Sequence, residues 1–135
     1  MRDGTAEPVS LRGALLAAEA SRRERKKNPT MAAGLSLVFN GLGQAYNGQF
    51  AKGVAVLFGS LLGLFLLIIP GVAIWFWGIY DAYATARRMN EGLTPYRETS
   101  VLAIATFMVI WALVIVALSA ASAMLLVAMG LQGMV

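Results

Sequence analysis

The feature that most constrains this chain is a long stretch without a charged side chain, from Val101 to about Met129. About 20 residues of helix cross the hydrocarbon core of a bilayer, so this stretch is long enough to cross it and to tilt or emerge. Hydrophobic residues make up 59% of the chain and charged residues 13%, whereas a soluble domain is about 25% charged. We therefore predict an integral membrane protein with an all-α fold.

An apolar segment earlier in the chain predicts a first membrane crossing. Asn28 can cap a helix whose first residue is Pro29, where a missing backbone N–H costs nothing. From Pro29 to Tyr46 a helix rises about 27 Å, just enough for a hydrocarbon core of about 30 Å. Polar residues lie in its outer part, so we expect regular helix only to about residues 39–42.

The segment from Gly53 to about Tyr80 predicts a second crossing, which makes three transmembrane helices in all. Pro70 interrupts it, and we expect one long helix kinked there. A tight hairpin at Pro70-Gly71 is the competing interpretation, but it leaves only about nine residues to return across the bilayer. Past Tyr80 the helix is expected to continue into water until Gly92 ends it.

The remaining segments are polar or short. From Ser10 to Lys27 the composition favours a helix, lying on the cytoplasmic membrane surface or on a partner; a solvated, partly frayed arm is the alternative. The basic cluster beside the first span is expected to attract anionic lipid headgroups; it comprises Arg22, Arg23, Arg25, Lys26 and Lys27.

The chain thus divides into a basic cytoplasmic arm (1–28), a helical pair (29–91), a cytoplasmic loop (92–100) and a third span with a short outer tail (101–135).

The distribution of lysine and arginine predicts the orientation. The N-terminal arm holds seven, the 44–52 turn one and the 81–100 loop three. Placing the N-terminus in the cytoplasm and the C-terminus outside leaves ten inside and one, Lys52, outside, in the cytoplasmic membrane of a prokaryote. An aromatic belt with one carboxylate gathers at the cytoplasmic end of the second span, and we expect it to act as an interfacial anchor; it comprises Trp75, Trp77, Tyr80 and Asp81.

Polar side chains recur at helical spacing along the first span. They are Ser36, Asn40, Gln44 and Asn47. One interpretation is a path for an ion or small solute. The other, which we favour because no charge lies on this face, is hydrogen bonding between helices.

Asp81 is the only acidic residue near a span. It could carry a proton or cation, but its place near water favours an anchor that binds the free amides at the start of the first helix or the basic segment 22–27.

Helix packing is expected at two small-xxx-small steps and at one tryptophan. The steps are Gly59 to Gly63 and Ser119 to Ala123, which let helices approach closely within the chain or between copies. Trp111 lies about ten residues into the third span, away from the usual interfacial belt, so we expect it to face protein.

Several classes of function are excluded by composition. The chain has neither cysteine nor histidine, which removes disulfides, thiol chemistry and metal ligation through these residues. We expect no cofactor and no catalytic residue, since no nucleophile–base pair or phosphate-binding loop appears. Nucleic-acid binding is not expected either, because orientation explains the basic excess and no stacking platform accompanies it.

Two short signatures resemble a known family. Lys27-Asn28-Pro29 precedes an apolar run, followed by the segment Gly41-Leu42-Gly43-Gln44-Ala45-Tyr46-Asn47-Gly48-Gln49, and Trp77-Gly78-Ile79-Tyr80-Asp81 ends the second span. Together they resemble the TM2-domain-like family of small prokaryotic membrane proteins over about residues 26–91. The resemblance implies two helices joined by a short turn, without an established enzymatic activity.

These observations predict a non-catalytic accessory or scaffolding subunit that binds other integral membrane subunits. The alternative is a small homo-oligomeric channel or transporter whose path would use Asp81 and the polar face of the first span, since three helices enclose no pore alone.

Overall fold

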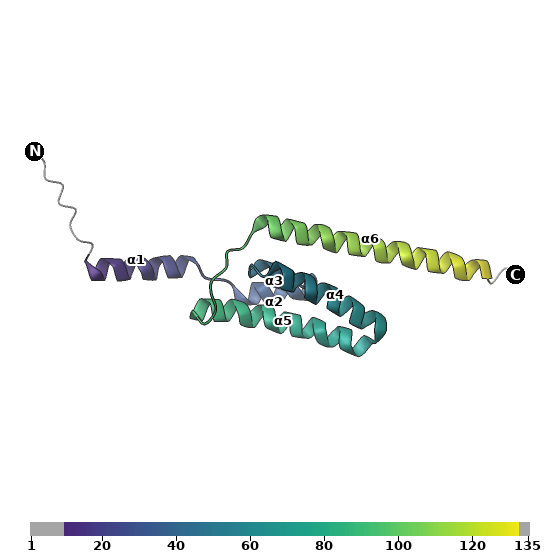
Figure 1. Ribbon diagram of the computed structural model, residues 1–135, viewed down its shortest axis with the longest axis horizontal. Helices are drawn as coiled ribbons and strands as arrows, with labels where there is room; N and C mark the ends of the chain where they lie inside the picture. The colour runs from purple at the N-terminus through teal and green to yellow at the C-terminus, as the bar shows by residue number, and fades with distance from the viewer. Residues whose placement is uncertain (1–9, 133–135) are drawn as a thin grey trace, which may run out of the picture.

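The computed structural model describes residues 10–132, without the side chains of residues 22–24, 131 and 132, and this part of the chain is helical with no strand (Figure 1). The all-α prediction is therefore confirmed for the described residues. The helices are α1 (Leu11–Glu24), α2 (Pro29–Val38), α3 (Leu42–Tyr46), α4 (Phe50–Leu66), α5 (Ile68–Glu91) and α6 (Val101–Gln132).

The first two helices begin where the sequence predicts. In α1 the hydroxyl of Ser10 accepts a hydrogen bond from the amide of Gly13 at 3.1 Å, and the helix lies apart from the others (Figure 1). In α2 the side chain of Asn28 accepts from the amide of Met31 at 3.1 Å, and Pro29 is the first helical residue.

The segment 29–46 does not cross the bundle from one end to the other. Helix α2 ends at Val38, because Phe39 is extended and Gly41 takes a left-handed conformation with φ of 91°. Helix α3 then returns, and the ammonium of Lys27 donates to the carbonyl of Tyr46 at 2.8 Å. The first and last residues of this segment therefore lie close together. A single crossing, as predicted from the sequence, would place them on opposite sides of the membrane.

The prediction of one long helix kinked at Pro70 is wrong. Leu67 alone separates α4 from α5; its φ is −153°, and the two helices pair as a hairpin (Figure 1). Pro70 is the third residue of α5, where a backbone N–H has no partner within the helix, so it does not bend α5. The length argument against a hairpin applies only to an arm that must cross a bilayer completely, and packing α4 on α5 has no such requirement.

Helix α6 is the one described helix long and apolar enough to cross a membrane, over Val101–Gly130. Its first third packs on the bundle, where Phe107 is fully buried with Leu42 and Leu57. The rest is exposed, and α6 ends beyond the α4–α5 turn (Figure 1).

Candidate functional site

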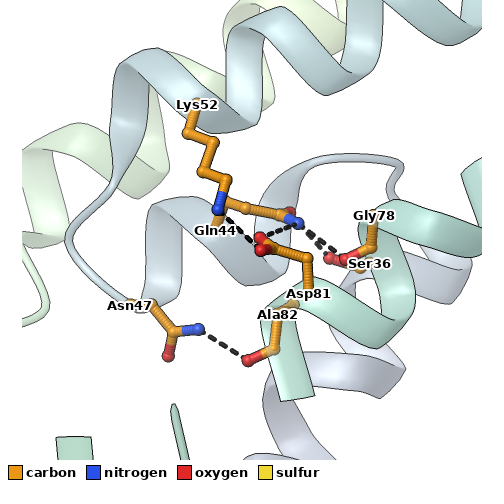
Figure 2. Close-up of polar contacts among 7 residues, drawn as sticks. All are labelled: Ser36, Gln44, Asn47, Lys52, Gly78, Asp81 and Ala82. Carbon is orange, nitrogen blue, oxygen red and sulfur yellow. Dashed lines mark hydrogen bonds and ion pairs between the residues drawn. The ribbon is translucent and has the colours of Figure 1, made fainter. Parts of the chain in front are cut away.

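The buried polar groups converge on Gln44, which has no exposed surface. Its Oε1 accepts from the hydroxyl of Ser36 at 3.0 Å, and its Nε2 donates to the carbonyl of Gly78 at 2.6 Å and to Asp81 Oδ2 at 3.4 Å (Figure 2). Ser36 comes from α2, Gln44 from α3, and Gly78 and Asp81 from α5. We call this group, with Asn47 and Lys52, the Gln44 junction.

Small residues allow the four helices of the junction, α2, α3, α4 and α5, to approach closely. A Cβ atom on Gly43 would lie 2.0 Å from the carbonyl oxygen of Ala32, and one on Gly78 would lie 2.6 Å from a methyl of Val56. Ala82 and Ala86 continue this face of α5 and are buried against Ala32. Sequence reasoning missed this stripe, although small residues at 78, 82 and 86 follow helical spacing.

Asp81 pairs with Lys52 in the structure. The ammonium lies 2.6 Å from Asp81 Oδ1, and the side chains are 37% and 16% exposed for Lys52 and Asp81, respectively. Lys52 also lies 5.4 Å from the ring centre of Trp77. The expected partners of Asp81, the start of the first helix and the 22–27 segment, are therefore not those found. The reason is the return of α3, which brings Lys52 to the end of the molecule where it was not predicted to lie.

The polar face predicted for the first span is brought together from two helices and a turn. Asn47 donates to the carbonyl of Ala82 at 2.8 Å (Figure 2), and the amide of Asn40 donates to the hydroxyl of Ser60. With Ser36 and Gln44, these side chains bond other helices of the same chain. Their donor groups make contacts between helices, while the Oδ1 atoms of Asn40 and Asn47 are buried without partners.

Lys27 organises a second cluster at the same end. The residue is only 4% exposed. Its ammonium donates to the carbonyl of Tyr46 and to the hydroxyl of Thr99. The same ammonium lies 4.8 Å from the ring centre of Tyr46 and 5.4 Å from that of Tyr96. The backbone of Lys27 exchanges hydrogen bonds of 2.8 and 2.7 Å with the amide side chain of Asn90. We call these five residues the Lys27 cluster. It joins four segments of the chain.

Burial lowers the pKa of Lys27 and keeps its ammonium from external ligands. Its pKa is lowered because burial removes the ammonium from water, while the negative charge of Glu98 raises it in part. The prediction that Lys27 contacts lipid headgroups is wrong, since the side chain is enclosed. Arg25 and Lys26 are exposed and remain available, and the side chains of Arg22 and Arg23 lie outside the described residues.

The predicted packing residues fall into two groups. Gly63 lies against Gly71, where an added Cβ would be 2.7 Å from the Cα of Gly71, and Gly59 faces Ile74. Both therefore pack within the chain. Ser119 and Ala123 are exposed on α6.

The aromatic residues divide in a similar way. Trp111 stacks edge-on against Phe39 at 5.3 Å, so it faces protein of the same chain. Trp75 donates to the carbonyl of Ser36 at 3.2 Å. Trp77 and Tyr80 are exposed, as an interfacial belt requires.

The carboxylate and the amide donors of the Gln44 junction have partners within the chain. The described residues contain no group of three or more aspartates, glutamates, histidines or cysteines that could hold a metal ion. The one carboxylate at the Gln44 junction is neutralised by Lys52, and the amides around it bond backbone carbonyls. The arrangement holds helices together.

Comparison with known proteins gives one relative and no function. The chain is 37% identical over 70 residues to an uncharacterized protein of Methanocaldococcus jannaschii, covering 52% of this chain and 62% of that relative. The match thus spans less than two thirds of the relative's length. No family model matches the chain, and no solved structure matches it.

Proposed function

We propose that this protein is a non-catalytic accessory or scaffolding subunit, anchored by α6, that binds other membrane proteins. The observation that carries the proposal is the exposure of α6 beyond Trp111. From residue 112 to residue 130 most of the helix is exposed, and large side chains such as Met124 and Leu126 are 75% and 70% exposed. This uncharged helix presents a long surface on which another transmembrane helix can pack.

The orientation rests on the separation of charge between the two ends of the molecule. The Lys27 cluster lies where α2 begins and α5 ends, the Lys52–Asp81 pair lies about 15 Å back along α5, and Arg87 and Arg88 lie between them on α5. Neither 53–80 nor 99–135 contains a charged side chain. Lys52 thus lies in the same half of the molecule as Lys27, Arg87 and Arg88, which supports a cytoplasmic location for that half and an outside location for the end of α6.

The depth of the α4–α5 hairpin favours α6 as the single crossing. From Lys52 to Leu66, and from Ile68 to Asp81, each arm rises about 20 Å, less than the hydrocarbon core of about 30 Å. The turn holds no polar side chain, and Phe65 and Ile69 are 87% and 83% exposed. An apolar turn of this kind can lie within the hydrocarbon core of a bilayer. Leu67 donates to the carbonyl of Gly63 and Pro70 has no N–H, which reduces the number of backbone groups left without partners at the turn.

Single-cysteine labelling tests this topology without background, because the chain has no cysteine. With a membrane-impermeant maleimide on intact cells, Gly130→Cys is expected to react from outside and Ser100→Cys only after permeabilisation. Ile68→Cys is expected to react in neither case, since a thiol in hydrocarbon does not ionise.

The labelling pattern separates the competing arrangements. Reaction of Ile68→Cys in intact cells would show that the hairpin crosses, which restores three spans as α4, α5 and α6. Reaction of Ser100→Cys from outside would overturn the orientation.

The accessory role is supported further by the resemblance to the TM2-domain-like family over residues 26–91, which adds a helical pair without an established activity. The pairing of Asp81 with Lys52, and the hydrogen bonds from Gln44 and Asn47 to carbonyls of α5, favour the accessory role over the channel alternative.

Native mass spectrometry after mild extraction and affinity purification tests the accessory role. We expect a stoichiometric complex with an unrelated membrane protein. Replacing residues 112–130 by a leucine–alanine sequence of equal length keeps an apolar span and is expected to weaken partner binding at least about tenfold, a loss of roughly 1.4 kcal/mol or more.

The control for this experiment is Leu11→Ser with Leu15→Ser, which changes exposed residues of α1 remote from the α6 surface. This variant is expected to retain the partner. Loss of the partner in the control alone would place the interface on α1. Recovery of a homo-oligomer without other subunits would contradict the accessory role.

A further inference from the structure

A cavity of about 570 Å³ lies between the end of α1, the end of α5 and the segment that follows α5. Two of its lining residues, Arg25 and Lys26, are exposed and positively charged. No aspartate or glutamate whose side chain the structure describes lines it, and Glu91, on the last turn of α5, pairs with Arg87 at 2.7 Å. The described lining is therefore cationic.

The walls of this cavity are held in place by the Lys27 cluster. Lys26 is joined directly to Lys27, whose backbone exchanges hydrogen bonds of 2.8 and 2.7 Å with the side chain of Asn90. On the opposite wall, the ring of Tyr96 lies 5.4 Å from the Lys27 ammonium. Asn90 and Tyr96 both line the cavity, as does the hydroxyl-bearing Thr94. A site whose walls are already ordered loses less entropy when it binds a ligand.

The cavity also lies close to the start of the helix that can cross a membrane. Tyr96 precedes Val101, the first residue of α6, by five positions, which span at most about 18 Å of extended chain. Polar headgroups flank the hydrocarbon core of a bilayer on both sides. When α6 crosses a membrane, a lipid headgroup can therefore reach the cavity from the membrane surface.

We propose that this cavity binds the phosphate group of an anionic membrane lipid. The guanidinium of Arg25 carries a planar fork of donors that matches phosphate oxygens, and Lys26 adds a second positive charge. The hydroxyls of Thr94 and Tyr96 can donate to an anion as well. Zwitterionic headgroups fit less well, because the described lining has no carboxylate to pair with their ammonium.

This site differs from the general attraction of basic segments to anionic membranes. General attraction depends on the number of charges near the surface, whereas a site depends on the residues that line it. The inference uses the membrane anchoring by α6 but not the accessory role.

The test measures lipid binding to the full-length protein by native mass spectrometry. Concentrated ammonium acetate screens the attraction between separated exposed charges. Phosphatidylglycerol is expected to bind at least about fivefold more tightly than phosphatidylcholine with the same acyl chains. Glycerophosphoglycerol, the same headgroup without acyl chains, is expected not to displace the lipid at equal concentration.

Two pairs of variants separate the cavity from general attraction. Arg25→Gln is expected to weaken phosphatidylglycerol binding about tenfold. Arg12→Gln removes the same charge from an exposed position of α1 outside the cavity and is expected to have an effect of less than about twofold.

The second pair changes no charge. Thr94→Val removes a hydroxyl from the lining and is expected to weaken binding about threefold to fivefold. Thr30→Val makes the same change at an exposed position of α2 outside the cavity and is expected to change nothing. This pair decides the matter if Arg25→Gln does not fold.

Three results would overturn the proposal. Equal weakening by Arg25→Gln and Arg12→Gln, or unchanged binding by Thr94→Val, would show that general attraction holds the lipid. Equal affinities for phosphatidylglycerol and phosphatidylcholine would show that the cavity does not select an anion. Displacement of the lipid by glycerophosphoglycerol would assign the cavity to a water-soluble phosphate ester. Each result leaves the partner-binding experiment unaffected, so failure here is distinguishable from failure of the accessory role.

Discussion

Replacing Gly43 with alanine is expected to lower the free energy of unfolding by at least about 3 kcal/mol. The new Cβ would lie 2.0 Å from the carbonyl oxygen of Ala32 and 2.4 Å from the hydroxyl of Ser36, so backbone must move. The contact between α2 and α3 cannot widen without breaking the hydrogen bond of 3.1 Å from the Gly43 amide to Ser36. Unfolding by sodium dodecyl sulfate in mixed micelles, followed by circular dichroism, measures the loss.

Gly34→Ala is the matched control for this substitution. Gly34 lies within α2, and an added Cβ there would meet nothing within 4 Å. Because alanine loses less backbone entropy than glycine in a helix, the control is expected to stabilise by about 0.5–1 kcal/mol. Equal effects of the two substitutions would contradict the close approach of α2 and α3.

The second large effect is expected from Gln44→Leu, which keeps the size of the side chain and removes its polar groups. It deletes hydrogen bonds to Ser36, Gly78 and Asp81. Hydrogen bonds between membrane helices contribute about 0.6 kcal/mol and those in water about 1, so the expected loss is about 2–3 kcal/mol in the same assay.

Gln49→Leu provides the matched control, because the Oε1 of Gln49 is buried without a partner. Removing an unpaired buried oxygen is expected to be neutral or stabilising. Ser36→Ala added to Gln44→Leu is expected to cost less than Ser36→Ala alone, since their shared hydrogen bond is already gone. Additive losses would mean that Gln44 and Ser36 act separately.

The helix boundaries that the sequence predicts are those marked by local chemistry. Asn28-Pro29 starts α2, and Gly92, with φ of 76°, ends α5, because a cap or a left-handed residue acts within a few positions. The long helix α6 follows equally directly from an uninterrupted apolar run.

The turn at Leu67 could not be predicted in the same way. Turns that face water carry polar residues or glycine, and the run around Leu67 has the same apolar composition as the helices beside it. Contacts between the two arms, such as Gly63 on Gly71 and Gly59 on Ile74, distinguish a hairpin from a straight helix.

The residues of the candidate site were predicted better than their partners. Helical spacing identified the polar face that includes Gln44 and Asn47, because that spacing is a local property. The pairing of Asp81 with Lys52 depends on whether the segment 29–46 crosses the molecule or returns. A left-handed Gly41 decides this, and sequence alone does not distinguish a glycine that turns the chain from one that packs in a helix.

The Lys27 cluster has a consequence for the order of events during synthesis. Lys27 reaches Tyr46 across 19 positions, Asn90 across 63 and Thr99 across 72. While the chain emerges from the ribosome, the first acceptor is available early and the last only when α6 is about to begin. We therefore expect the ammonium to stay hydrated until then and its burial to follow the pairing of the helices.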